Sequence, residues 1–176
     1  MIDLSLLNPE PWIATGAVAF LEKFLGGIKE PRILEFGSGC STLFFAEFTS
    51  NLISVEHSPK WHDLMQQALR QRNLKVDLRL ISHNYYEVCQ KFSPNYFDLI
   101  IIDGKYRMAC LQAARSIVRP GGVIMLDDSN MREKYEVANE IMFDWQRFMT
   151  SEMKGNPLNP HETLELSETT WWIKST

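Results

Sequence analysis

The sequence predicts an α/β fold, in which a mostly parallel sheet of seven strands carries helices on both faces and ends in an antiparallel last strand. Short apolar runs alternate with segments of helical periodicity, which is the pattern of repeated strand–helix–strand units. One run, Phe97–Ile102 (FDLIII), is apolar almost throughout, as expected for a strand buried on both faces of a parallel sheet. The last two expected strands follow each other without a helix, so the final strand should be antiparallel.

The first half of the chain begins with a helix and then alternates strands and helices. The opening helix is expected over Pro11–Leu25, because its apolar residues recur at helical spacing and two glycines follow. The other expected elements are a strand at Arg32–Phe36, a helix at Leu43–Phe48 with Ser41 and Thr42 as caps, a strand at Asn51–Val55, and a helix that begins at Ser58-Pro59.

The second half continues this alternation and ends in a hairpin. The expected strands are Val76–Ile81, Phe97–Ile102 and Val123–Leu126, and the expected helices are Tyr85–Phe92, Met108–Val118 and Glu133–Trp145. Pro120-Gly121-Gly122 is predicted to separate the helix from the fifth strand. The hairpin strands are expected near Arg147–Met153 and at Thr169–Lys174, with a loop between them that contains Pro157 and Pro160.

Composition narrows the functional classes. A chain of 176 residues with 45% hydrophobic and 23% charged residues is predicted to form one domain, residues 1–176, with 1–30 as an N-terminal helical lid segment. The net charge of −4 argues against a nucleic-acid partner. No apolar run approaches the roughly 20 residues that span a membrane. The three cysteines are scattered, and the N-terminus lacks the basic residues that begin a signal peptide. Both observations favour a cytoplasmic location.

The strongest functional signal is the turn Gly37-Ser38-Gly39 after the first expected strand. Glycines in this place allow a tight turn and the close approach of a ligand. Glu56 ends the second strand about twenty residues later, where a carboxylate accepts hydrogen bonds from ribose hydroxyls. Glu35 would repel a pyrophosphate and favour a positively charged sulfonium with a free amino group. The pattern therefore predicts a cationic nucleoside ligand.

These motifs resemble those of the class I S-adenosylmethionine-dependent methyltransferases, which have a Rossmann-like fold. The resemblance rests on LEFGSGCST, VEHS, FDLIIIDG and RPGGVIMLDDS, which occur in the family's order. It implies S-adenosylmethionine as cofactor, with Ser82, His83 and Asn84 beside the adenine. The candidate cofactor-binding residues are Glu35, Gly37, Ser38, Gly39, Ser41, Glu56, His57, His83, Asn84 and Asp103. Ser41 stands where the family pattern has a further glycine.

Three aspartates follow the fourth and fifth expected strands and should meet at the carboxyl edge of the sheet: Asp103, Asp127 and Asp128. Two mechanisms are compatible with them. In one, they bind a divalent cation such as Mg²⁺, which lowers the pKa of an acceptor hydroxyl. This is similar to the catechol-type O-methyltransferases, which have an asparagine where Asp128 stands. In the other, no metal binds and Asp103 or His83 is the base.

Lys105 and Arg107 follow Asp103 and leave two alternatives open. They would either hold an anionic group of the substrate or neutralise the aspartates. We predict Asp103 and Arg107 as catalytic residues. The expected function is methyl transfer from S-adenosylmethionine to a small-molecule acceptor, on oxygen, and the alternative is a non-catalytic S-adenosylmethionine-binding or scaffold protein of the same fold. A homodimer is left open.

Overall fold

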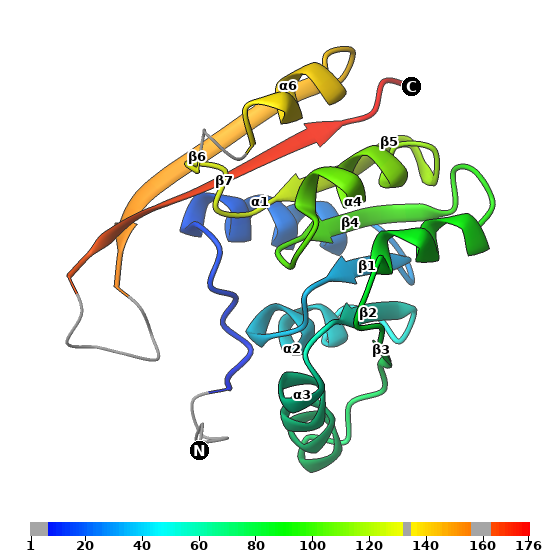
Figure 1. The fold of residues 1–176 in the computed structure, drawn as a ribbon, viewed down its shortest axis with the longest axis vertical. Helices are drawn as coiled ribbons and strands as arrows, with labels where there is room; N and C mark the ends of the chain where they lie inside the picture. The colour runs from blue at the N-terminus through cyan, green and yellow to red at the C-terminus, as the bar shows by residue number, and fades with distance from the viewer. Residues whose placement is uncertain (1–6, 132–134, 156–162) are drawn as a thin grey trace.

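A computed structural model describes residues 7–131, 135–155 and 163–176. Its elements are α1 (Thr15–Gly26), β1 (Ile33–Phe36), α2 (Cys40–Ala46), β2 (Leu52–Glu56), α3 (Pro59–Gln71), β3 (Asp77–Leu80), the 3₁₀ helix η2 (Tyr85–Lys91), β4 (Phe97–Ile102), α4 (Arg107–Ala114), β5 (Val118–Leu126), α6 (Val137–Ile141), β6 (Gln146–Lys154) and β7 (Glu165–Ile173). The seven strands form one sheet in the order β3-β2-β1-β4-β5-β7-β6 (Figure 1). β7 is antiparallel to both of its neighbours. The predicted fold class is confirmed.

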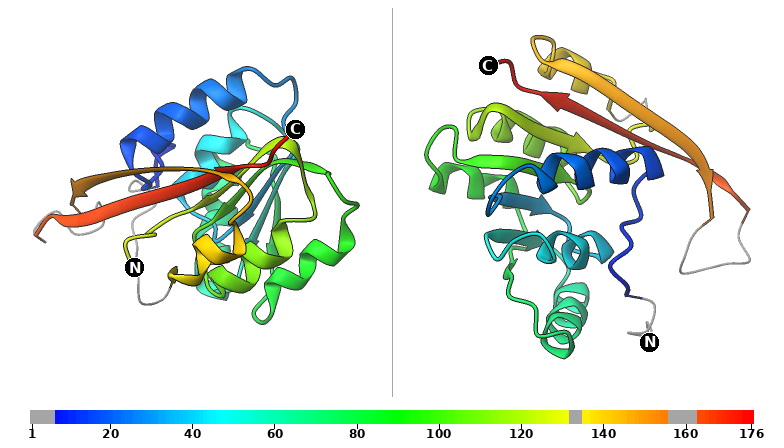
Figure 2. Two further views of the ribbon diagram at one scale, coloured as in Figure 1. Left: turned by 90° about the horizontal axis from the view of Figure 1, so that it is seen from above. Right: turned by 180° about the vertical axis from the view of Figure 1, so that it is seen from behind.

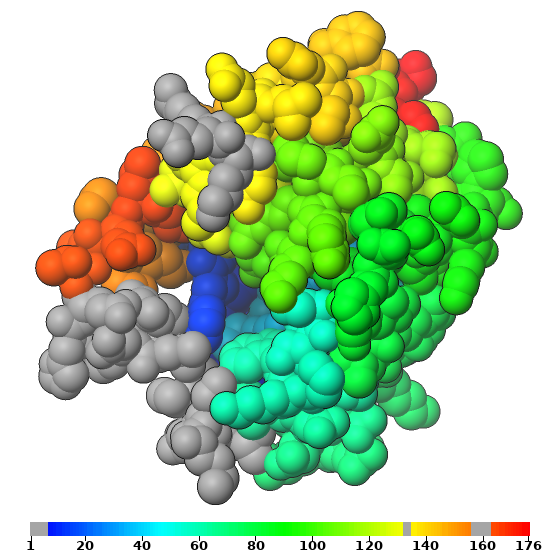
Figure 3. Space-filling view, in the orientation of Figure 1, coloured from blue at the N-terminus to red at the C-terminus, as the bar shows by residue number. Residues whose placement is uncertain are grey.

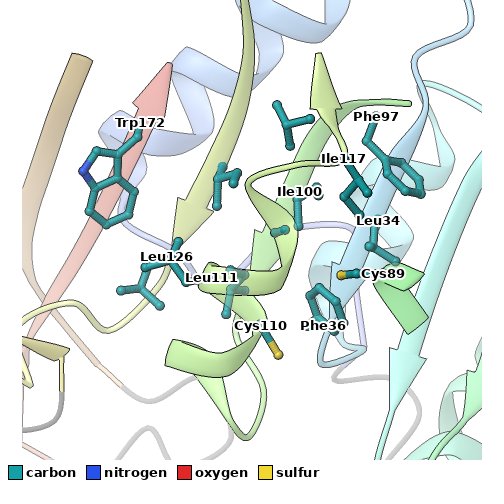
Figure 4. Packing of buried hydrophobic residues seen from close by; sticks show 14 of the residues in the cluster. Leu34, Phe36, Cys89, Phe97, Ile100, Cys110, Leu111, Ile117, Leu126 and Trp172 are labelled. Atoms are coloured by element: carbon teal, nitrogen blue, oxygen red, sulfur yellow. The ribbon is translucent and has the colours of Figure 1, made fainter. Parts of the chain in front are cut away.

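The helices lie in two layers, one on each face of the sheet. The left view of Figure 2 shows α1 on one side and α4 and α6 on the other. Because side chains alternate along a strand, Ile33 packs with the α1 and α2 side chains, whereas Leu34 and Phe36 pack towards η2 and α4. Figure 4 shows this second layer. Burial of both sheet faces explains why β1 and β4 are fully buried along their length.

The strand order reverses between β1 and β4. β1 pairs in parallel with β2 on one side and with β4 on the other. The connections that leave β1 and β4 therefore run to opposite faces of the sheet, and a crevice opens beyond their carboxyl ends. The glycine turn after Phe36 and the aspartate after Ile102 both lie at this edge.

Several element boundaries differ from those expected. The helix predicted over Met108–Val118 ends at Ala114, and β5 begins at Val118 instead of Val123. The Pro-Gly-Gly segment is thus part of the strand, where the register with β4 shifts between Phe97 and Leu99. A glycine at positive φ (Gly121, φ 70°) lets the strand absorb this irregularity.

The predicted helix Glu133–Trp145 and the capping position of Ser41 also need correction. Among the described residues the helix α6 covers Val137–Ile141, Tyr135 is helical as well, and Glu133 lies outside them. Ser41 and Thr42 lie inside α2, whose N-cap is Gly39, and Thr42 contributes to the cap because its hydroxyl accepts from the backbone N–H of Gly39 at 2.9 Å. The loop prolines Pro157 and Pro160 lie outside the described residues.

The N-terminal segment runs along the carboxyl edge of the sheet before α1 begins (Figure 1). Leu7 is fully buried in a cluster with side chains of α2 and α3. The guanidinium of Arg72, the residue directly after α3, donates to the carbonyl of Leu7. α1 itself packs on the sheet through Ala17, Leu21 and Leu25. Of residues 1–30, which we expected to form a lid, 1–6 lie outside the described residues. No helix in the described parts of the chain is long and apolar enough to cross a membrane.

Candidate functional site

Glu35 is buried beneath the glycine turn in a cage of three hydroxyl groups. Its carboxylate accepts hydrogen bonds of 2.5 Å from each of Ser41, Thr42 and Ser54. These donors come from α2 and β2, so the carboxylate links both elements to β1. No part of Glu35 is exposed. Glu35 therefore supports the turn from below, and its direct contact with a ligand stays a prediction.

Burial raises the pKa of Glu35 from its ordinary value of 4.5 to about 7. Desolvation is the largest cause, and the three hydroxyl donors oppose it because they stabilise the ionised form. Glu56 adds a smaller increase, since a nearby negative charge disfavours ionisation. Glu35 therefore changes its charge near neutral pH.

Glu56 ends β2, and its carboxylate is held by the glycine turn and by the start of α3. One oxygen accepts from the backbone N–H and the hydroxyl of Ser38, at 3.0 and 3.1 Å. The other accepts from the backbone N–H groups of His57 and Ser58, at 2.8 and 2.7 Å. The indole of Trp61 donates to the carbonyl of Ser38. This arrangement fixes the carboxylate beside the turn.

The glycine turn lies against the loop that follows β4. Gly37 has a φ of +97°, and a Cβ atom there would be 2.8 Å from the backbone nitrogen of Gly104. Gly104 is restricted as well, because a Cβ atom on it would clash with the hydroxyl oxygen of Tyr85. Gly39 differs from both, since a Cβ atom there would face open space. Gly37 thus brings two loops of the edge into contact, and Gly39 leaves room above the turn.

The segment after β3 completes this side of the edge. The backbone N–H of Ile81 donates to the carbonyl of Glu56 at 2.8 Å, and the ring of Tyr85 stacks on His57 with 6.2 Å between centroids. Residues 82–84, which include His83 and Asn84, are exposed between these two anchors. Asn84 has a φ of 48°, which asparagine tolerates better than most residues. The predicted adenine-side residues therefore border the same edge as Glu56.

The three predicted aspartates come together around Arg107. Carboxylate oxygens of Asp103, Asp127 and Asp128 lie within 4.8 Å of one another. Nη2 of Arg107 donates to Asp103 Oδ1 at 3.1 Å and to Asp128 Oδ2 at 3.0 Å. Arg107 therefore pairs with the aspartates, as in the second of the two alternatives that the sequence left open. Lys105 is exposed.

Crowding of negative charge raises the pKa of two of these carboxyls. Asp127 is 4% exposed, and desolvation followed by the charge of Asp128 raises its pKa to about 6. The side chain of Asp103 keeps 36% exposure. Protein packed around its carboxyl and the charge of Asp127 nevertheless raise its pKa above the ordinary value, while Arg107 opposes this. A raised pKa makes Asp103 a stronger base than an isolated aspartate.

The geometry does not fit a divalent cation at this cluster. Mg²⁺ needs about six oxygen ligands in octahedral geometry. Oxygens of Asp103 and Asp128 already accept from the Arg107 guanidinium. Asp127 Oδ1 accepts from the hydroxyl of Thr169 at 2.6 Å. A metal among these carboxylates would lie beside a buried positive charge, so no step is assigned to a metal.

Sequence reasoning missed several residues of the site. Ser54 could have been found, because a serine inside the apolar strand LISVE needs a polar partner when it is buried. Thr169 lies on β7, 42 residues from Asp127, and no local pattern links the two. Tyr135 places its ring 5.5 Å from the guanidinium carbon of Arg107 and likewise has no sequence signal.

A family model described as "Methyltransferase domain" matches residues 34–129. No curated protein sequence matches the chain. A similar solved structure is an O-methyltransferase from Bacillus cereus in complex with SAH, with 18% identity and a TM-score of 0.67 over 92% of this chain and 82% of that one. A precorrin 8W decarboxylase from Methanobacterium thermoautotrophicum has 16% identity and a TM-score of 0.67, over 98% and 95%. A precorrin-6y C5,15-methyltransferase from Geobacter metallireducens has 16% identity and a TM-score of 0.64, over 98% and 97%. At these identities the likeness to the solved structures concerns the fold.

Proposed function

Because this chain belongs to the family of methyltransferase domains, we propose that it binds S-adenosylmethionine at the carboxyl edge of its sheet and transfers the methyl group to a hydroxyl oxygen of a small molecule. The observation that carries the proposal is the position of Glu56 and the glycine turn on one side of the switch point, with Asp103 following β4 on the other. The SAH complex of the Bacillus cereus enzyme of similar fold supports this choice of cofactor.

The adenosyl part of the cofactor would lie along β1 and β2. Glu56 would accept the ribose hydroxyls, since Ser38 and the N–H groups that follow β2 hold its carboxylate in one orientation. The exposed segment with His83 and Asn84 would border the adenine. Figure 3 shows a hollow on this face, between the N-terminal segment in blue and the loop after β4 in green. The N-terminal segment would cover the cofactor from that side.

The sulfonium would lie near the aspartate cluster. When all three aspartates are ionised, their charge exceeds the single positive charge of Arg107. The excess negative charge would attract a sulfonium and would not hold the neutral thioether of the product as strongly. The electrostatics of the edge therefore favour this cofactor over one with a pyrophosphate.

The acceptor would enter a cavity of about 460 Å³ between the start of α4 and the segment after β5. Its wall includes Tyr106, Met108 and Tyr135, which suit an aromatic or otherwise apolar acceptor. Lys105 is an exposed residue of its lining, and its ammonium has no ion-pair partner among the described residues. An acceptor with an anionic group would therefore bind with this group at Lys105.

The mechanism needs an aligned acceptor and a base. Methyl transfer is an in-line displacement, in which the acceptor oxygen attacks the methyl carbon and the thioether leaves. Asp103 would take the proton from the acceptor hydroxyl, because it lies at the carboxyl end of β4 next to the cavity wall at Gly104. The guanidinium of Arg107 keeps the Asp103 carboxylate in place through its 3.1 Å hydrogen bond.

Calorimetry and turnover measurements test the two halves of this proposal separately. SAH should bind the wild type, and Glu56→Gln should weaken binding by about tenfold or more, since a charge-assisted hydrogen bond contributes roughly 1.5–3 kcal/mol. Asp103→Asn should retain SAH binding and lower kcat by about 100-fold. The absence of SAH binding at millimolar concentration would contradict the cofactor assignment. Binding without turnover of any acceptor would favour the non-catalytic alternative.

A further inference from the structure

We propose that Arg107 is a built-in cation that occupies the position of a divalent metal at the transfer site, so that methyl transfer by this chain is independent of metal. The proposal rests on the proposed function for its catalytic consequence. Its structural premise is that the arginine prevents metal binding by the three aspartates, and a metal-binding measurement tests this premise without any turnover assay.

Arg107 contacts the loops after both β4 and β5 through all three of its guanidinium nitrogens. Its Nη2 bonds both Asp103 and Asp128, its Nη1 donates to the carbonyl of Asp127, and its Nε donates to the carbonyl of Gly104 at 3.0 Å. Its side chain is only 11% exposed. The guanidinium thus bridges both loops, which is the structural task that a shared metal ion would perform.

The chain directs Arg107 into the cluster by its local backbone. Tyr106 precedes α4 in the left-handed conformation, with a φ of 56°, and Arg107 is the first residue of the helix. Asp128 is also left-handed, with a φ of 49°. This conformation is unfavourable for tyrosine, whereas aspartate tolerates it better than most residues. The contacts of the neighbouring Arg107 side chain therefore offset the cost at Tyr106.

Charge and geometry together exclude a metal while Arg107 is in place. A guanidinium carries one positive charge and a fixed fork of N–H donors, which here point at the oxygens that a metal would need. A divalent cation beside the guanidinium would be repelled by it, and this repulsion offsets part of the attraction by the three carboxylates. Removal of the guanidinium would leave three carboxylates within 4.8 Å of one another and without this neutralising charge. Such a group is a hard-oxygen site for Mg²⁺ or Mn²⁺.

The test titrates Mn²⁺ alone into the wild type and into Arg107→Ala, with water proton relaxation and calorimetry as readouts. We expect no saturable binding by the wild type up to millimolar Mn²⁺, and at least a tenfold gain in affinity in Arg107→Ala. The gain should disappear in Arg107→Ala with Asp128→Asn. Arg115→Ala is the matched control, because Arg115 follows α4 and pairs with Asp144, away from the cluster. It should not gain Mn²⁺ affinity.

Separate outcomes refute the two proposals. Saturable binding of Mn²⁺ by the wild type at micromolar concentration, or loss of its turnover in EDTA, would overturn the role of Arg107 and leave cofactor binding intact. A folded Arg107→Ala protein without any gain in Mn²⁺ affinity would overturn it as well. If Arg107→Ala does not fold, the wild-type titration decides alone: absence of Mn²⁺ binding supports the proposal and saturable binding rejects it. Failure to bind SAH would instead reject the proposed function.

Discussion

Glu35→Gln should remove most of the decrease in the free energy of unfolding that the ionisation of Glu35 causes as the pH rises. The carboxyl of Glu35 is fully buried, and its pKa is raised from 4.5 to about 7 by desolvation above all. A buried acid with a raised pKa stabilises the fold in its neutral form. Its contribution is fully present below pH 4.5 and is lost as the pH rises towards 7, because the folded state must then ionise a group that the unfolded state ionises at less cost.

The magnitude follows from the two pKa values. Each pKa unit corresponds to ~1.4 kcal/mol, so the increase from 4.5 to about 7 amounts to ~3 kcal/mol of lost stability above pH 7. Integration of the linkage relation assigns ~2.5 kcal/mol of this loss to the interval between pH 5 and pH 8. Glutamine stays neutral, and the three hydroxyl groups around position 35 can each donate to or accept from its amide.

Urea unfolding at pH 5 and pH 8 measures the effect. The free energy of unfolding of the wild type should fall between these pH values by ~2.5 kcal/mol more than that of Glu35→Gln. The comparison cancels the contributions of Asp103 and Asp127, which both proteins share. Glu47→Gln is the matched control at an exposed position near the end of α2, and it should follow the wild type. Equal pH dependence in the wild type and Glu35→Gln would contradict the assignment of this stability loss to Glu35.

Two further substitutions test the site. Gly37→Ala should lower the free energy of unfolding by at least ~2 kcal/mol in urea denaturation, because φ is +97° and the new methyl would meet the backbone of Gly104. Gly26→Ala, which meets no atom within 4 Å, should change it by less than ~1 kcal/mol, and equal effects would contradict this account. Lys105→Ala should raise KM for an anionic acceptor by about tenfold and leave SAH affinity and neutral acceptors unchanged. Lys91→Ala, at an exposed end of η2, is its control, and a similar loss with neutral acceptors would exclude a charge role for Lys105.

The fold was predictable because its periodicity is local. FDLIII is buried on both faces as β4, with the bounds that the sequence predicts. The boundaries failed where context overrides local signals. Pro120-Gly121-Gly122 has the composition of a turn, yet β5 continues through it, because the carbonyl of Lys174 accepts from the N–H of Gly121 and the N–H of Lys174 donates to the carbonyl of Gly122.

The edge of the sheet at which the candidate site lies was predictable, and the arrangement of its side chains only partly. The carboxyl ends of parallel strands share one edge, so the order of strands and polar residues in the chain predicted Glu56, Asp103 and Asp127 at the same edge. The sequence could not show that Glu35 is enclosed by hydroxyl groups, since Ser54 reaches it from another strand. It also left open whether Arg107 would meet a substrate or the aspartates.

The residue pattern alone was enough to predict the sheet, its antiparallel end and the edge at which the polar residues gather, because apolar periodicity is a property of a few neighbouring residues. The pairing of charges with their partners follows only from the assembled fold. Burial and distances of a few ångströms set the pKa of Glu35 and the pairing of Arg107 with Asp103 and Asp128. Electrostatic energies in a partly buried site depend steeply on such distances, and residues far apart in the chain fix them only when the whole fold is assembled.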